Sequence, residues 1–502
     1  MISKAVRRML AVSLAAVMAI GAAGCGNGGD TTQTPDPTKA PDNAGTTDTK
    51  KEETPAAPTE APVEEVDPEY VVITDENGNP IDLGGMQVIV RDWWGDGSST
   101  DDKLAKAENA YDEARWEYVK WCEETYNFTI IEQAMGDWTS NPTDFTTYVD
   151  TMGDENNYIF TLRQCGEIAI AANSGYAYDL AKLDCLDFSE EKFQHTNIHF
   201  LTGNGTNIYA FKTGHPEPRG CLYFNKRLLE ELTGITADEM YDMQAAGNWT
   251  WDKFEEILKT IKAKGDQNND GIIDIYPMAQ DSAFYKSAVF SNGGQFIDKT
   301  ADGKFFNDLE SAETLEALNW AVRMNSEYQK PTPEGGAWNW FFADFMNGGF
   351  VFMTGQVYMA GQDLKDMADD FGCLAFPKGP AASDYISYYE DNVLMIPSCY
   401  DADRAWKIAF AYDLYTQPIS GFDTSDGWKS GYYQTMRDTR AVDETIQSFM
   451  DSSVLSPALF VPEVDLGNDL LYSLGWDRTP AQLAEEIREA WNSKIEKANV
   501  VK

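Results

Sequence analysis

The sequence predicts an α/β protein with two lobes. Strand-like and helix-like segments alternate early in the chain, with strands at 85–94, 128–136 and 157–164 and helices at 112–127 and 167–180. This β-α-β-α-β order is typical of a mainly parallel sheet covered by helices. The region from about residue 69 to residue 502 also exceeds an ordinary domain of about 100–200 residues. We therefore expect it to divide into two lobes.

The individual elements follow from the pattern of their side chains. Residues 85–94 alternate in polarity and are rich in β-branched residues, whereas 112–127 place Trp116, Val119, Trp121 and Cys122 on one helical stripe. The helix at 167–180 is expected to end near Gly175. Further along the chain we expect a strand that runs into a helix (220–235), a helix (248–265), a hairpin (291–308) and a helix (311–328).

The helix expected at 248–265 has the most distinct start. Thr250 is its expected N-cap, because a threonine hydroxyl can accept a hydrogen bond from the first free backbone N–H groups. One stripe of apolar side chains should face the core: Trp251, Phe254, Ile257, Leu258 and Ile261. We also expect Trp338 and Trp340 to belong to the core rather than to a binding site.

The N-terminus predicts export. Residues 1–24 contain Lys4, Arg7 and Arg8, followed by a short apolar run and small residues, which is the layout of a secretory signal peptide. The sequence "AAGC" resembles a bacterial lipobox, so we expect Cys25 to become the acylated first residue of the mature protein. The alternative is an ordinary signal peptide in which Cys25 has no role.

Residues 25–68 are expected to form a disordered tether. Between Cys25 and Val63 there is no Val, Ile, Leu, Met, Phe, Trp or Tyr. Such a segment buries too little apolar surface to offset the entropy of ordering it. As a flexible chain it would span on the order of 35 Å. This length would hold a folded domain, residues 69–502, away from the membrane.

Composition narrows the possible partners. The formal net charge of −43 argues against nucleic acid, because phosphate binding needs a basic surface. The chain also has 14 Trp, 24 Tyr and 25 Phe, and exposed rings of this kind suit carbohydrate, whose flat apolar faces stack on them. The seven Cys show no CxxC spacing, so no disulfide pairing is predicted.

Several segments from about residue 80 to the end resemble the family 1 extracellular solute-binding proteins, the sugar-capturing receptors of ABC importers, to which maltose-binding protein is distantly related. The segments occur in the family's order: "GCLYFNKRLLEELTGI", "GNWTWDKFEEILKTIKAKG", "FSNGGQFIDKTADGKFFNDLESAETLEAL", "FMTGQVYMAGQDL", "IPSCYDADRAWKIAFAYDLYTQP" and "TPAQLAEEIREAWNSKI". Each string alone is weakly specific, and the ordered set behind a lipobox and a tether is what carries the resemblance.

The resemblance implies a two-lobed fold of the type II periplasmic binding proteins, with ligand in a cleft between hinge-linked lobes. We expect lobe 1 to hold about 69–215 and 356–395, and lobe 2 about 216–355 and 396–502. The implied function is capture of a sugar or oligosaccharide at the cell surface and its delivery to the membrane permease subunits of an ABC importer. We expect a monomer that is not an enzyme.

The resemblance also implies which residues contact ligand. Candidates at strand ends are Asp92, Trp93 and Trp94 after the first strand, and Arg163 and Gln164 after the third. Further candidates are Glu217, Arg219, Asp281, Gln362, Asp363 and Trp428, the last as a ring on a lid. For Arg163 a structural salt bridge is the alternative, and one of the two adjacent tryptophans could instead pack against its own lobe.

The stretch "DQNNDGIIDIYP" resembles a calcium loop. Oxygen ligands would come from alternate positions: Asp266, Asn268, Asp270, the Ile272 carbonyl and Asp274. Pro277 stands where an EF-hand has its bidentate Glu, so we expect a structural Ca²⁺ clip rather than a calcium sensor, and such turns occur at this place in the resembled family. The alternative is a turn rich in Asp and Asn that binds no metal.

Few sequence motifs support an enzymatic function. His195 and His199 have zinc-like spacing but lack the Glu of HExxH, and the sequence contains no GxSxG and no phosphate-binding loop. With 82 Asp and Glu, a pair of glycosidase carboxylates remains possible. The open alternatives are therefore a surface glycoside-acting enzyme, a peptide receptor, and a binding module for a sensor kinase.

Overall fold

The computed structural model describes residues 70–137, 140–163, 174–194, 207–279, 283–389, 392–422, 427–461 and 463–500. The predicted signal peptide, the tether with Cys25, and the first half (167–173) of the helix expected at 167–180 lie outside the described residues, and the described half, 174–180, forms no α-helix. So do Gln164, Asp281, His195 and His199. Buried apolar side chains in the described part form two clusters, and we name the elements around them lobe 1 and lobe 2.

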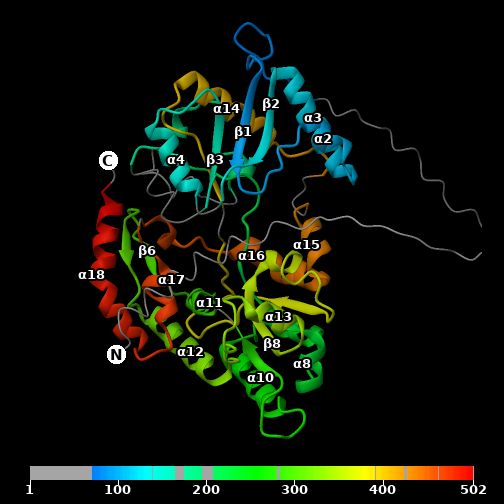
Figure 1. Cartoon of the computed structure of the whole chain (residues 1–502), viewed down its shortest axis with the longest axis vertical. Coiled ribbons are helices and arrows are strands. Elements are labelled where there is room, and N and C mark those ends of the chain that lie inside the picture. The colour runs from blue at the N-terminus through cyan, green and yellow to red at the C-terminus, as the bar shows by residue number, and fades with distance from the viewer. Residues whose placement is uncertain are drawn as a thin grey trace, which may run out of the picture. The chain divides into compact units, whose positions relative to one another are not determined.

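Lobe 1 is built on a four-stranded sheet in the order β10-β3-β1-β2 (Figure 1). The strands are β1 (Met86–Asp92), β2 (Phe128–Ala134), β3 (Asn157–Leu162) and β10 (Val393–Met395). β1 pairs in parallel with β2 and β3, and β10 pairs antiparallel with β3. The prediction of a mainly parallel sheet is therefore confirmed. The helices of this lobe are α2 (Thr100–Ala105), α3 (Ala110–Tyr126), α4 (Asn141–Asp150), α6 (Glu191–Gln194) and α14 (Ala402–Tyr415).

Lobe 2 is built on a second four-stranded sheet in the order β5-β8-β4-β9. The strands are β4 (Gly220–Asn225), β5 (Tyr276–Ala279), β8 (Phe350–Gln356) and β9 (Phe371–Leu374). β5 runs parallel to β8, whereas β4 runs antiparallel to both β8 and β9. β5 and β8 therefore end at the same edge of the sheet, next to the start of β4.

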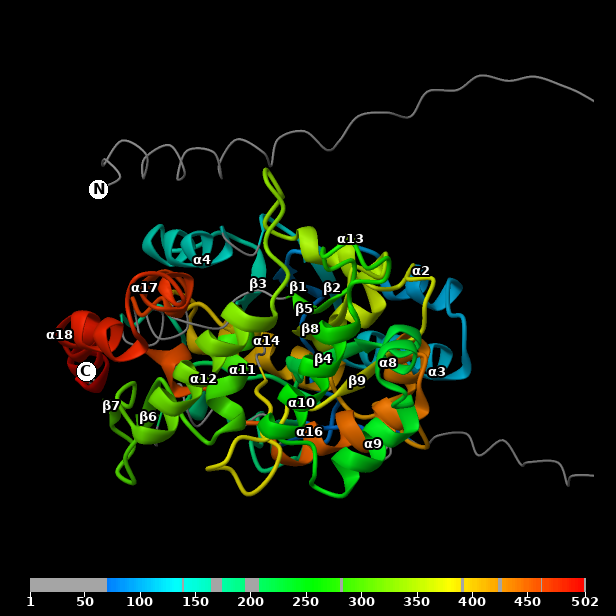
Figure 2. The ribbon, with the colours of Figure 1, turned by 90° about the horizontal axis from the view of Figure 1, so that it is seen from below.

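Helices surround this second sheet. They are α8 (Lys226–Thr233), α9 (Ala237–Ala245), α10 (Trp251–Lys264), α11 (Ala283–Ser291), α12 (Ala312–Tyr328), α13 (Trp340–Met346), α15 (Lys429–Met436), α16 (Gln447–Ser452), α17 (Leu466–Asp469) and α18 (Pro480–Asn499). The expected hairpin consists of β6 (Ile297–Lys299) and β7 (Phe305–Asn307), and α18 lies beside it (Figure 2). Phe305 and Asn499 join the two by a pair of 2.8 Å hydrogen bonds. No described helix has both the length and the apolar composition needed to span a membrane.

Helix α10 shows how pattern becomes packing. The Thr250 hydroxyl accepts a hydrogen bond from the Lys253 N–H at 3.4 Å, so the expected N-cap is confirmed. All five side chains of the predicted apolar stripe are buried, and burying a side chain of this size stabilises the fold by about 1.5–3 kcal/mol. Trp251 also stacks on Trp320 of α12, with ring centroids 4.2 Å apart.

The chain passes from one cluster to the other at 211–221, 388–393 and 419–436. A backbone hydrogen bond joins the first two connections, since the Arg219 N–H donates to the Tyr388 carbonyl (2.9 Å), and the Tyr389 N–H donates to the Val454 carbonyl (3.1 Å) just after α16. Gly220 is required here, since a Cβ at this position would lie 2.6 Å from the Tyr388 ring. The connections therefore pack closely, as expected of a hinge.

The clusters correct the expected lobe boundaries. Residues 356–389 were expected in lobe 1, but Val357, Leu364 and Tyr388 pack in the core of lobe 2. The beginning of the range expected in lobe 2, residues 396–419, instead packs in the core of lobe 1. The reason is that β9 pairs with β4 and so keeps its segment in lobe 2, whereas β10 pairs with β3 and carries α14 into lobe 1.

Candidate functional site

The first candidate surface lies where the parallel strands of lobe 1 end. Trp93 and Trp94 follow β1 directly; Trp93 is half-buried and Trp94 is 54% exposed. Their rings meet edge to face, with centroids 4.8 Å apart. Gly95 closes the turn against the backbone of β2, where a Cβ would lie 2.4 Å from Glu132. The fold thus presents one indole to solvent and supports it with the other.

Asp92 holds this turn. Its Oδ1 accepts hydrogen bonds from the backbone N–H groups of Trp94 (3.1 Å) and Gly95 (2.7 Å). The side chain is fully buried, and Oδ2 has no hydrogen-bond partner among the described residues. Burial raises the pKa of this carboxyl above its ordinary value. In this conformation Asp92 therefore positions the two tryptophans and is not open to a ligand itself.

Arg163 follows β3 and is half-buried at the same edge of the sheet as Trp93 and Trp94. This adjacency arises because β1 and β3 are parallel and paired in register, with Val90 opposite Ile159. Asp92, Trp93, Trp94 and Arg163 therefore lie at one edge of the sheet, and contact of the last three with a ligand stays a prediction.

The second candidate surface lies at the edge of lobe 2 where β8 ends. Arg219 pairs with Glu217 at 2.8 Å and donates a 3.4 Å hydrogen bond to Oε1 of Gln356. Its guanidinium also lies 5.0 Å from the ring centroid of Tyr358, within the range of a cation–π interaction. A half-buried ring, a guanidinium, a carboxylate and an amide therefore lie together at this edge. We call these four residues the Arg219 cluster: Tyr358, Arg219, Glu217 and Gln356.

Trp428 lies beside the connection that carries the Arg219 cluster. Its ring centroid is 6.0 Å from that of His215 and 5.8 Å from that of Tyr432. The indole is half-buried, and Trp428 directly precedes α15. α15 packs near the end of β8, where a side chain at Gly361 would come within 2.8 Å of Thr435.

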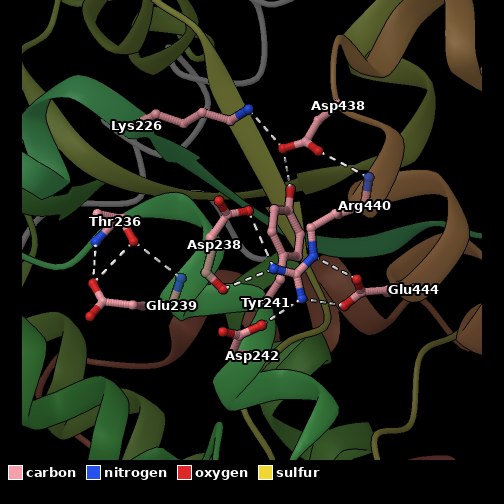
Figure 3. Close-up of polar contacts among 9 residues, drawn as sticks. All are labelled: Lys226, Thr236, Asp238, Glu239, Tyr241, Asp242, Asp438, Arg440 and Glu444. Carbon is pink, nitrogen blue, oxygen red and sulfur yellow. Dashed lines mark hydrogen bonds and ion pairs between the residues drawn. The ribbon is translucent and has the colours of Figure 1, made fainter.

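An ion-pair network holds the segment after α15 to lobe 2 (Figure 3). Arg440 pairs with Asp242 (2.8 Å), Asp238 (3.3 Å) and Glu444 (2.6 Å). Asp438 pairs with Lys226 at 2.7 Å and accepts a 2.9 Å hydrogen bond from the Tyr241 hydroxyl. We infer that this network fixes the position of α15 and hence of Trp428.

Gln362 and Asp363 follow a short 3₁₀ turn at Val357–Gly361 that begins at the end of β8. Gln362 is exposed, and Asp363 is half-buried. Burial raises the pKa of the Asp363 carboxyl. Both residues thus belong to the segment that carries Tyr358, and their contact with a ligand stays a prediction.

The predicted calcium loop forms a series of turns between α10 and β5. Asp266 accepts hydrogen bonds from the N–H groups of Asp270 (3.2 Å) and Gly271 (2.8 Å), and Asp274 accepts one from Gln267 (2.8 Å). Gly271 has φ +86, which favours glycine. Among the described residues, no group of three or more His, Cys, Asp or Glu side chains is arranged to hold a metal. The calcium clip therefore stays a prediction.

A cavity of about 540 Å³ lies elsewhere in lobe 2, between the start of α10, α12 and residues 378–380. None of the predicted ligand residues lines it. Arg323 in its wall is already paired with Glu255 through two 2.9 Å hydrogen bonds. We place the candidate site at the sheet edges instead, because open α/β sheets bind ligands at the ends of their strands.

Sequence reasoning missed three side chains at the second surface: Gln356, Tyr358 and His215. Tyr358 lies in the quoted segment "FMTGQVYMAGQDL", where the signal was an aromatic residue two positions after the end of a buried strand.

The structure also overturns one expectation for the tryptophans. Trp340 packs partly buried on the core of lobe 2, but Trp338 is 79% exposed.

No protein family model matches the chain, and no curated protein matches it. Solved structures do match. A binding protein for cyclic α-maltosyl-1,6-maltose from Arthrobacter globiformis is 14% identical, with a TM-score of 0.55 over 82% of this chain and 100% of that one. An ABC substrate-binding protein from Listeria monocytogenes in complex with cycloalternan is 17% identical, with a TM-score of 0.53 over 82% and 98%.

A third similar structure is an ABC transporter-associated binding protein from B. animalis subsp. lactis in complex with β-1,6-galactobiose, 14% identical, with a TM-score of 0.53 over 82% and 98% of the two chains. At these identities the likeness establishes the fold. The described chain has the two-lobed α/β fold of maltose-binding-like solute-binding proteins, and the structures it resembles are binding proteins rather than enzymes.

Proposed function

We propose that this protein is a lipid-anchored cell-surface receptor that captures a sugar or oligosaccharide and delivers it to the permease subunits of an ABC importer. It would be held to the membrane by acylated Cys25 and act as a monomer without performing chemistry. The signal peptide and lipobox-like sequence at residues 1–25 support the anchor. The similar structures support the cargo, because two of them are complexes with a sugar and the third is a sugar-binding protein.

One observation carries the ligand class: each lobe presents an aromatic ring and a guanidinium at one edge of its sheet. Lobe 1 offers Trp94 and Arg163, and lobe 2 offers Tyr358 with Arg219 and Gln356. Rings stack on the apolar faces of sugars, and guanidinium and amide groups bind hydroxyls in a fixed orientation. Closure of the two lobes on one ligand would bring both sets to it.

We further propose that residues 266–274 bind Ca²⁺ as a structural clip. The oxygens of Asp266, Asn268, Asp270 and Asp274 fall on one tight loop, and Ca²⁺ prefers oxygen ligands. The proposed role is to fix the connection between α10 and β5, so that calcium stabilises lobe 2 without touching the sugar.

A thermal-shift screen of residues 69–502 against an oligosaccharide panel tests the receptor proposal. A ligand that binds only the folded state raises the unfolding midpoint by mass action. We expect a selective rise with one class of sugar, which is then recovered intact. Recovery of cleaved sugar would favour a glycoside-acting enzyme. A rise in the unfolding midpoint with peptides alone would show that the cargo is a peptide rather than a sugar.

A further inference from the structure

Trp338 is the observation that the core of lobe 2 leaves unexplained. Its indole is 79% exposed, and every residue from 331 to 339 is exposed. Trp is highly buried on average, so an indole held in water on a defined loop indicates a binding role. The residues around it on the loop are mainly Pro and Gly, and Glu334 is the loop's single charged residue.

The loop begins at the ligand edge of lobe 2. Gln329 pairs in parallel with Met278 of β5, and the Lys330 N–H donates to the Met278 carbonyl at 2.8 Å. The chain therefore leaves the sheet beside Ala279, the last residue of β5. Because β5 is parallel to β8, this is the edge at which β8 delivers Gln356 and Tyr358.

The backbone of the loop is also restrained at its ends and at one turn. The Lys330 ammonium pairs with the Asp344 carboxylate at 2.7 Å and so joins the two ends of the loop. Within it, the Gly336 N–H donates to the Pro333 carbonyl (2.9 Å), and Gly335 has φ +70, as a type II turn requires. A loop restrained in this way loses little conformational freedom when a ligand binds, which favours affinity.

We infer that Trp338 stacks on a sugar ring at the outer end of a bound oligosaccharide, so that the cargo is longer than a disaccharide. This inference rests on the proposed receptor function. A membrane surface fits the loop poorly, because 331–339 contains no Lys or Arg to meet anionic lipid. A flat, neutral, partly apolar ligand fits an exposed indole on a loop that leaves lobe 2 beside the end of β5.

The test measures affinities by calorimetry for malto-, xylo- and galacto-oligosaccharides of two and four units, using residues 69–502. We expect Trp338→Ala to weaken binding of the four-unit sugar about tenfold and of the two-unit sugar less than twofold. Trp338→Phe should keep most of the affinity, because it keeps a ring. Trp476→Ala is the matched control, since Trp476 is 78% exposed on another segment of lobe 2 and should leave both affinities unchanged.

An unchanged four-unit affinity in Trp338→Ala, or an equal loss for both lengths, would overturn the inference while leaving the receptor intact. If Trp476→Ala lost as much affinity for the four-unit sugar as Trp338→Ala, the effect would not be specific to the position of Trp338, and the inference would be wrong. If the unmodified protein binds only two-unit sugars, the inference is also wrong. If it binds none of the probes, both the receptor proposal and this inference fall together.

Discussion

The guanidinium of Arg219 lies 5.0 Å from the ring centroid of Tyr358 and pairs with the carboxylate of Glu217 at 2.8 Å. One side chain thereby connects the segment that enters lobe 2 to the end of β8. The Tyr223 hydroxyl reinforces the same place by donating to the carbonyls of Gln356 (2.9 Å) and Val357 (3.0 Å). The ring of Tyr358 is thus presented from a fixed backbone.

Tyr358→Ala should therefore weaken sugar binding at least tenfold, a loss of about 1.4 kcal/mol, without lowering the unfolding midpoint appreciably. Tyr358→Phe keeps the stacking face and should bind within a few-fold of the unmodified protein. Calorimetric titration with the sugar found in the screen measures both variants. Tyr472→Ala, at another exposed tyrosine of lobe 2, is the control; equal affinities for Tyr358→Ala and the control would remove Tyr358 from the site.

At the edge of lobe 1, Trp94→Ala should abolish measurable binding, because Trp94 is the exposed member of the indole pair. Trp93→Ala should act by removing the support of that indole, and should also destabilise the fold more, since Trp93 is half-buried. Titration and urea unfolding separate the two effects. Normal binding by both variants would show that the first strand end is not part of the site.

The two halves of the network in Figure 3 should differ in their contribution to stability. Asp438 is 11% exposed, and Asp438→Ala would leave both Lys226 and the Tyr241 hydroxyl without this acceptor. We expect a loss of about 2–3 kcal/mol in the free energy of unfolding. Arg440→Ala breaks pairs with the exposed carboxylates of Asp238 and Asp242 and with the partly exposed Glu444, and should cost only about 1 kcal/mol. Urea unfolding of the two variants checks this order, and a larger loss for Arg440→Ala would contradict it.

The pair between Glu255 of α10 and Arg323 of α12 should make the free energy of unfolding depend on pH. Hydrogen bonds with the Arg323 guanidinium lower the pKa of Glu255 to about 2 from its ordinary value of 4.5. The unfolded state therefore binds more protons between these values, so the stabilisation is complete above about pH 4.5 and is lost as pH falls towards 2. Because Arg323 is partly exposed, we expect about 1–2 kcal/mol at neutral pH.

Urea unfolding of Glu255→Gln at pH 7, 4.5 and 3 measures this contribution. The difference from the unmodified protein should be nearly as large at pH 4.5 as at pH 7 and clearly smaller at pH 3. Glu256→Gln is the control, because Glu256 is exposed and pairs with Lys253 one turn away. A difference that does not vary with pH would show that Glu255 stabilises the fold by packing rather than by its charge.

Sequence patterns predicted the sheets and helices well where apolar periodicity was strong. The stripe from Trp251 to Ile261 and the parallel order of β1, β2 and β3 are both present. The lobe boundary was wrong because strand partners far apart in sequence decide it: β10 joins β3 across more than two hundred residues. No local pattern encodes such a pairing.

The candidate site was predicted in part for a similar reason. A strand end indicated Trp94, and the family resemblance indicated Arg219. The partners of Arg219, Gln356 and Tyr358, lie at and just after the end of β8, more than a hundred residues away. Asp92 was predicted as a ligand contact, and its burial below the turn could not be read from its place after a strand. Trp338 was expected in the core, but the sequence around a tryptophan does not show whether its side chain is buried or exposed.

Calcium should raise the unfolding midpoint of residues 69–502, and a chelator should reverse the rise. Asp266→Ala and Asp270→Ala should each abolish the rise, because each removes an oxygen donor from the loop. Asp302→Ala, at an exposed turn of the β6–β7 hairpin, should not change it. A calcium-induced rise that survives both loop variants would place the ion elsewhere.

The most direct test of the central claim is a crystal structure of residues 69–502 with the oligosaccharide that gives the largest thermal shift. The account predicts intact sugar in contact with Trp94 of lobe 1 and Tyr358 of lobe 2. Sugar bound instead in the cavity beside Trp320, away from both rings, or sugar cleaved between two carboxylates, would contradict it.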